Sequence, residues 1–265
     1  MDPLDRIAAA LERLAPPPPP IADPLVHPAY LWRGGVLEVA RGWAPRPLDA
    51  LIGIDAQKAT LLDNLHRLAR GHAAHDVLLW GARGSGKSAL VGSAVDRVRR
   101  EGGDLALVEV ADLPGLPALF ARLADIPRAF ALFVDDLGFD APADARALRS
   151  LLEGGAEARP ANVRLLVTAN RRHLVARDHP DGEAVAPRDA LDDQLALADR
   201  FGLSLGFHAL DQDGYLAIVR AYTQAGELPF DPADAVRWAV QRGGRSGRVA
   251  WQYAVELAGR AGRTL

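Results

Sequence analysis

Short apolar runs alternate with stretches of helical periodicity between residues 48 and 209. Five of these runs have the length of strands, at residues 76–80, 105–110, 129–136, 163–170 and 203–209. Continuous apolar strands are buried on both faces, as in parallel sheets that helices cover on both sides. The pattern therefore predicts an α/β fold with a parallel five-stranded sheet.

The strand pattern stops after residue 209, and three helices are predicted to follow it. The first begins at Asp211, the second has Asp231 as its N-cap and Pro232 at its first position, and the third opens at Ser246. Asp and Ser are favoured at these positions because their side chains accept hydrogen bonds from the free N–H groups of a first helical turn. The C-terminal part is therefore expected to be a small all-helical domain.

These patterns divide the chain into three parts. Residues 1–47 hold an amphipathic helix at 2–15, five prolines at 16–20 that cannot continue it, and an extended segment. The helix either packs on its own domain or is a tethered docking element for a partner. The other two parts are the α/β core and the helical domain, at residues 48–209 and 210–265.

Composition and charge narrow the classes of function. With 49% hydrophobic and 25% charged residues and a formal net charge of -3, the chain has the composition of a soluble globular protein, without a cationic field for nucleic acid. The absence of cysteine excludes disulfides, thiolate zinc sites and a cysteine nucleophile. No apolar run approaches the ~18 residues that span a bilayer, and the first residues are acidic where a secretion signal is basic. We therefore expect a cytoplasmic protein with no membrane partner.

The strand at 76–80 is followed directly by GARGSGKS, which matches G-x-x-x-x-G-K-[ST] at every fixed position. Its glycines let the backbone wrap a phosphate closely, with amide hydrogens pointing inward at a helix N-terminus. Lys87 would reach the β and γ phosphates of ATP, and the Ser88 hydroxyl would ligate Mg²⁺. This segment, called the P-loop below, supplies the candidate nucleotide-binding residues Gly81, Ala82, Arg83, Gly84, Ser85, Gly86, Lys87 and Ser88.

Lysine is rare in this chain. The 31 basic residues comprise 29 Arg and 2 Lys, at positions 58 and 87. A position that keeps Lys among so many arginines indicates a site that needs a compact ammonium on a flexible stem rather than a planar guanidinium. This favours a functional P-loop over a glycine-rich turn that only joins a strand to a helix.

Polar residues end two of the predicted strands. Asp135 is placed to hold Mg²⁺ through its water, and Asp136 beside it to orient or deprotonate an attacking water. Aspartate is one methylene shorter than glutamate, which is found there in many hydrolysing P-loop proteins, so either the strand lies closer to the γ-phosphate or hydrolysis is slow. Asn170 would present its amide to the γ-phosphate or the lytic water; taken alone, it indicates a turn.

The order of P-loop, acidic strand, strand-final Asn, Arg near the last strand and helical domain resembles the AAA+ superfamily of P-loop ATPases. More closely, the segments LWRGGVLE, LIGIDAQK, LFVDDLGF, TANRRHL and DRFGL are similar to the bacterial AAA+ group catalogued as domain-of-unknown-function family 815. The similarity covers about residues 30 to 260. It implies an AAA+ core with a helical lid, and no cellular role.

The resemblance implies roles for further residues. Ile52, Gly53 and Ile54 are similar to the segment that lines the adenine pocket in AAA+ proteins. Asn170 resembles sensor 1, and Arg248 resembles sensor 2, which couples the lid to the γ-phosphate.

Arg200 resembles the arginine finger that AAA+ proteins insert into a neighbouring subunit's site, which implies a homo-oligomer. In a chain with 29 arginines, a single Arg match is a weak signal. A surface salt bridge with Asp199 is the alternative for Arg200, and Arg171, Arg172 and Arg245 remain rival candidates.

We therefore predict an ATP-binding AAA+ protein that hydrolyses ATP with Mg²⁺, as a conformational switch or to remodel a protein partner. A helicase-loader-like, DNA-associated ATPase is an alternative by analogy with the superfamily, although the charge does not support nucleic-acid binding. A nucleotide-gated scaffold with little hydrolysis is suggested by Asp136. A small-molecule kinase would share the P-loop, but a helical C-terminal domain carrying Arg248 is not its usual companion.

Overall fold

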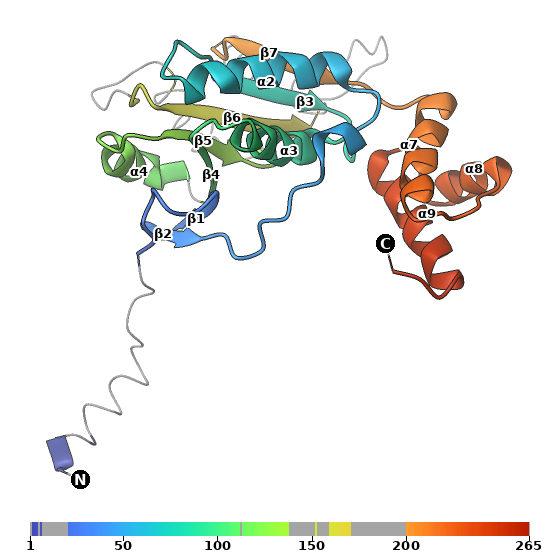
Figure 1. Cartoon of the computed structure of the whole chain (residues 1–265), viewed down its shortest axis with the longest axis horizontal. Coiled ribbons are helices and arrows are strands. Elements are labelled where there is room, and N and C mark those ends of the chain that lie inside the picture. Colours follow the sequence, from blue (N-terminus) through green and yellow to red (C-terminus); the bar gives the residue numbers. More distant parts are fainter. Residues whose placement is uncertain are drawn as a thin grey trace, which may run out of the picture.

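The computed structural model describes residues 2–4, 6, 21–111, 113–137, 152, 159–170 and 200–264. Over these residues, one sheet with helices on both faces is joined to a group of three C-terminal helices (Figure 1). Most of the predicted N-terminal helix, the five prolines and the rival arginines Arg171 and Arg172 lie outside the described residues. None of the described helices is long and apolar enough to cross a membrane.

Among the described residues, the sheet has seven strands in the order β2-β1-β4-β5-β6-β3-β7. All neighbouring pairs are parallel except β1 with β2. The strand bounds are β1 Ala29–Arg33, β2 Val36–Val39, β3 Val77–Gly81, β4 Leu105–Val110, β5 Ala129–Val134, β6 Val163–Asn170 and β7 Leu203–Phe207.

The five predicted strands are present as β3 to β7, and the count of five is too low because β1 and β2 extend the sheet. These two strands form a hairpin around Gly34 and Gly35, which have φ values of 56° and 77°. Two consecutive residues with positive φ are typical of the tight turn that joins antiparallel strands. The Gly-Gly pair between two apolar runs was therefore a hairpin signal that the sequence interpretation did not use.

Two hydrophobic cores lie on opposite faces of the sheet. Along β5, Phe130, Leu132 and Val134 belong to one core, whereas Ala131 and Phe133 belong to the other, as the alternation of side chains along a strand requires. Helix α4 (Leu116–Leu123) packs on the first face, and α2 (Asp55–Ala69) and α3 (Lys87–Arg100) pack on the second. Two short 3-10 helices, Leu48–Ala50 and Leu113–Gly115, precede α2 and α4.

The last three helices are α7 (Gln212–Ala225), α8 (Pro232–Gln241) and α9 (Gly247–Arg260), called the C-terminal bundle below. The predicted N-caps are confirmed: the side chains of Asp211, Asp231 and Ser246 each accept a hydrogen bond from a backbone N–H in the first turn. The bundle buries its own core of small and aromatic side chains, among them Tyr215, Ala235, Ala239, Ala250 and Tyr253.

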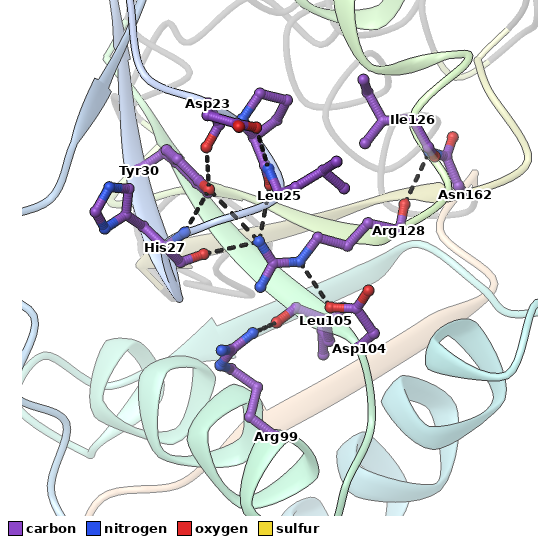
Figure 2. A network of polar contacts seen from close by, with 11 residues as sticks. Asp23, Leu25, His27, Tyr30, Arg99, Asp104, Leu105, Ile126, Arg128 and Asn162 are labelled. Carbon is purple, nitrogen blue, oxygen red and sulfur yellow. Dashed lines mark hydrogen bonds and ion pairs between the residues drawn. The ribbon is translucent and has the colours of Figure 1, made fainter.

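A buried arginine fastens the segment before β1 to the edge of the core (Figure 2). The Arg128 guanidinium donates to the carbonyl oxygens of Pro24 at 2.8 Å and His27 at 2.9 Å, and its Nε lies 2.9 Å from Asp104 Oδ1. The Tyr30 hydroxyl donates to the Asp23 carbonyl at 2.7 Å. Hydrogen bonds to a charged donor satisfy main-chain carbonyls that would otherwise be buried without partners.

Candidate nucleotide-binding site

The P-loop connects the carboxyl end of β3 to the N-terminus of α3, as the sequence predicted. Gly81, Gly84 and Gly86 have φ values of 136°, 72° and 97°. Gly86 is the N-cap of α3 and provides no side-chain cap, so the first N–H groups of the helix point toward the loop. Free amide hydrogens at a helix N-terminus form a site for an anion such as phosphate.

The neighbouring strand β7 requires glycine at position 81. A Cβ atom at this position would lie 2.0 Å from the carbonyl oxygen of Phe207, the last residue of β7. The same oxygen accepts a hydrogen bond from Ala82 N at 3.1 Å. Only glycine therefore allows the loop to leave β3 while its backbone stays bonded to β7.

The Lys87 side chain lies inside the loop. Its Nζ donates to the carbonyl oxygens of Gly81 at 3.0 Å and Ala82 at 2.8 Å, and the residue is only 8% exposed. Burial lowers the pKa of the Lys87 ammonium, while the carboxylates of Asp136 and Asp135 act in the opposite direction. The single ammonium is thus held between the loop and two acidic residues.

The two acidic residues follow β5, the second strand along the sheet from β3. The Ser88 hydroxyl donates to Asp135 Oδ1 at 2.7 Å. A hydroxyl that gives its proton to a carboxylate keeps its lone pairs for a cation, and oxygen ligands of this kind suit Mg²⁺. Ser88 and Asp135 therefore fit the metal that the P-loop motif implies.

Asp136 and Asn170 meet in front of the loop. The Asn170 side-chain amide donates to Asp136 Oδ1, and the strand register places Asn170 directly beside Gly81. Asp136 has a φ of 49°, a left-handed conformation that few residues other than glycine, asparagine and aspartate adopt. The three polar residues predicted at the ends of β5 and β6 are therefore brought together with the P-loop.

Thr168 is a polar residue of the site that sequence reasoning missed. Its hydroxyl donates to Asp135 Oδ1 at 2.6 Å and accepts a hydrogen bond from Asp136 N at 2.7 Å. The signal was available, because Thr168 lies two residues before Asn170 in a predicted strand and residues two apart share one face. The structure thus adds a fourth polar side chain to the group formed by Asp135, Asp136 and Asn170.

The C-terminal bundle contacts the P-loop at the N-terminus of α9. Gly247 N donates to Gly84 O at 3.0 Å, and a Cβ atom on Gly84 would lie 3.0 Å from Ser246 Oγ. Arg248, the next residue of α9, is close enough that its positive charge contributes to lowering the pKa of Lys87, as does Arg83. Arg248 is therefore brought to the P-loop, as predicted.

The segment 52–54 lies between the P-loop and the bundle. Ile54 is buried, and its Cδ1 atom would lie 3.8 Å from a Cβ atom on Gly86. Ile52 packs against the core of the C-terminal bundle. Gly53 between them has a φ of 79° and open space where a side chain would begin. The three residues thus offer apolar side chains and a turn of backbone next to the phosphate loop.

Residues 26–261 match the family model described as a protein of unknown function, DUF815. This chain belongs to the DUF815 family. No curated protein sequence matches it significantly.

Solved structures of two AAA+ P-loop ATPases resemble this DUF815 chain. A mutant of RuvB from Thermotoga maritima has a TM-score of 0.52 and 19% sequence identity, over 79% of this chain and 64% of its own, slightly under two thirds. The T. maritima RuvB Holliday junction branch migration motor has a TM-score of 0.51 and 19% identity, over 83% of this chain and 67% of its own. The Orc1 protein of Aeropyrum pernix, in complex with DNA, has a TM-score of 0.54 and 17% identity, over 82% and 65%. These likenesses show the AAA+ fold.

Of the candidate arginines, Arg200 lies at the end of the sheet opposite the P-loop, whereas the rival Arg245 directly precedes Ser246, which contacts the loop. Arg200 precedes β7, and Leu203 of β7 is paired with Val77 at the start of β3, whereas the P-loop follows the end of β3. The five residues of β3 span about 13 Å from one end of the strand to the other. Arg245 contacts Gln212 within the C-terminal bundle, at 3.4 Å. Arg200 is thus not part of the site formed by its own chain.

Proposed function

We propose that this protein binds Mg-ATP at the P-loop and hydrolyses it, and that the C-terminal bundle acts as a lid that responds to the nucleotide. The observation that carries the proposal is the convergence of three features at the carboxyl ends of β3 and β5. These are a glycine loop at a helix N-terminus, the buried Lys87 ammonium inside it, and the Ser88–Asp135 hydrogen bond beside it. A phosphate chain and a divalent cation satisfy all three.

Each polar residue has a role in this proposal. The amide hydrogens of the P-loop and Lys87 bind the β and γ phosphates, and Ser88 and Asp135 hold Mg²⁺, which neutralises phosphate charge when bound. Asp136 accepts a proton from the attacking water, and Asn170 orients Asp136 through the hydrogen bond between their side chains. The adenine base packs against segment 52–54, whose apolar side chains contact the base and whose main-chain groups bond to it.

The contact between the P-loop and the C-terminal bundle supports a switch. Gly84 and Gly247 are joined by a main-chain hydrogen bond, so a phosphate that rearranges the loop also acts on α9. Arg248 at the start of α9 would bind the γ-phosphate of ATP and lose that partner in ADP. A ligand shifts a conformational equilibrium only through such differential contacts. The protein partner that receives this motion docks on the chain in its ATP-bound form.

Calorimetric titration of the purified chain with Mg-ATP tests the proposal. The Lys87→Ala variant is expected to lose binding, because the only ammonium inside the loop is removed. Lys58→Ala is the matched control: Lys58 is the only other lysine and forms an ion pair with Asp55 at 3.0 Å on α2. Equal affinities of the wild type and Lys87→Ala for Mg-ATP would refute the proposal.

Hydrolysis is tested separately from binding. Asp136→Asn keeps the hydrogen-bonding shape of the side chain but removes the proton acceptor, so turnover should fall at least about 100-fold with affinity nearly unchanged. Phosphate release under single-turnover conditions measures the step. A negligible rate in the wild type that Asp136→Asn does not change would instead favour the nucleotide-gated scaffold.

Arg200 is proposed to act in the site of a neighbouring copy of the chain. Its place before the start of β7, at the end of the sheet opposite its own P-loop, supports this role. The rate of hydrolysis per subunit should then rise with protein concentration as the copies assemble, and Arg200→Ala should remove that rise. A rate per subunit that stays constant over a wide dilution series would contradict assembly-dependent catalysis.

A further inference from the structure

We propose that Thr168 is a positioning residue that sets both acidic residues of the site through its hydroxyl group. The inference rests on the proposed function and adds to it a residue that acts on the metal side and the water side together. Thr168 lies on β6, is 1% exposed, and faces the turn that follows β5. It would contact neither nucleotide nor metal, so its effect is exerted through Asp135 and Asp136.

Thr168 holds the turn after β5 by three hydrogen bonds to three consecutive residues. Its hydroxyl donates to Asp135 Oδ1 at 2.6 Å and accepts from Asp136 N at 2.7 Å, and its main-chain oxygen accepts from Leu137 N at 2.8 Å. A threonine hydroxyl has one proton to donate, and here that proton is used on the carboxylate. The direction of both side-chain bonds is therefore fixed, because a backbone N–H can only donate.

The bond to Asp135 orients the carboxylate that would hold Mg²⁺. Ser88 Oγ and Thr168 Oγ1 both donate to the same oxygen, Oδ1 of Asp135, at 2.7 Å and 2.6 Å. Ser88 comes from α3 and moves with the P-loop, whereas Thr168 belongs to the central sheet. When the loop adjusts to a nucleotide, Thr168 keeps the carboxylate in place. Side chains that orient a metal ligand in this way affect metal affinity as the ligands themselves do.

The bond from Asp136 N fixes the residue proposed to accept a proton. Asp136 has a φ of 49°, a conformation that costs free energy unless the surroundings hold it. Thr168 supplies the 2.7 Å hydrogen bond to its backbone, while Asn170 from the same strand holds its carboxylate. Two residues on one face of β6 thus determine where the Asp136 side chain points.

Three measurements on Thr168→Val test the role. Valine has the shape of threonine without the hydroxyl, so both side-chain bonds are lost while the strand stays filled. We expect kcat to fall by about 10-fold to 100-fold and the Mg²⁺ concentration for half-maximal ATP binding to rise by about tenfold, the range seen when groups that orient metal ligands are removed. ATP affinity in EDTA, measured by calorimetry, should change by less than about twofold, because the P-loop is untouched.

Three further variants distinguish an effect on the positions of the carboxylates from an effect on stability. Thr168→Ser restores the hydroxyl and should recover kcat and Mg²⁺ dependence to within about threefold of the wild type. Thr223→Val is the matched control, because Thr223 is also 1% exposed and its hydroxyl donates within α7, to Val219 O at 3.0 Å. It should leave both values unchanged. If Thr168→Val unfolds, Thr168→Ala removes the same hydroxyl in a smaller side chain and should give the same losses.

The outcomes distinguish this inference from the function on which it rests. A wild type that binds no Mg-ATP overturns both. A wild type that binds and hydrolyses Mg-ATP, together with Thr168→Val and Thr168→Ala variants of normal kcat and normal Mg²⁺ dependence, overturns the role of Thr168 alone. Losses that Thr168→Ser fails to restore would also overturn it, since they would come from packing and not from the hydroxyl.

Discussion

Replacing Gly81 by alanine should strongly destabilise the protein, because the added methyl group has no space. The new Cβ would lie 2.0 Å from Phe207 O, and the backbone has a φ of 136°, which side chains rarely allow. A residue forced into such a conformation costs about 1–3 kcal/mol, and loss of the hydrogen bond from Ala82 N to Phe207 O costs about 1 kcal/mol more. We therefore expect the free energy of unfolding to fall by about 2–4 kcal/mol.

Urea denaturation followed by tryptophan fluorescence measures this loss. Gly71→Ala is the matched control: Gly71 also has a positive φ, of 71°, but has no atom within 4 Å of the added Cβ. It should lower the free energy of unfolding by only about 1 kcal/mol, because only the backbone conformation is then unfavourable. Gly81→Ala should also weaken Mg-ATP binding, because Gly81 O holds Lys87 Nζ at 3.0 Å. Equal losses of stability in the two variants would show that the close approach to β7 does not constrain position 81.

Three other substitutions test separate contacts. Arg248→Ala should weaken ATP binding about tenfold and leave ADP binding unchanged in calorimetry, because only ATP offers a γ-phosphate. Arg46→Ala removes a guanidinium that lies 5.0 Å and 4.0 Å from the ring centroids of Tyr222 and Trp251, and should lower the free energy of unfolding by about 1 kcal/mol in urea, with Arg46→Lys between the two. Arg128→Leu leaves the part-buried carbonyls of Pro24 and His27 without their donor and should cost about 2–4 kcal/mol, with faster hydrogen exchange over residues 22–30.

The central strands could be predicted because their residues form continuous apolar runs. All five runs became parallel strands, and each strand end lies within two residues of its predicted position. The hairpin of β1 and β2 was missed because β2 has only four residues and one fully buried side chain, so its pattern resembles an extended segment. The position of the hairpin in the sheet depends on parallel pairing of β1 with β4, which is more than seventy residues away in the chain. Local patterns contain no information on such a pairing.

The residues of the candidate site were predictable where a motif fixes their spacing. Lys87, Ser88 and the two aspartates follow from the P-loop and the acidic strand, and the structure brings them together. Thr168 was missed because a buried threonine in an apolar strand is an ordinary β residue. The sequence places Thr168 on the same face of the strand as Asn170, but its contact with Asp135 depends on the alignment of β5 with β6, in which Val134 pairs with Val167.

Besides the hydrogen bond between Gly84 and Gly247, two residues of the stretch before α2 attach the C-terminal bundle to the rest of the chain. Arg46 lies over the rings of Tyr222 and Trp251, and Ile52 packs into the core of the bundle. Trp251 lies three residues after Arg248 on α9, so the two share one side of the helix. A rotation of α9 that moves Arg248 relative to the P-loop must therefore also move Trp251 relative to Arg46. Residues 46–52 follow β2 along the chain. If the bundle acts as the lid, its movement is therefore transmitted through this segment to β2 at the edge of the sheet.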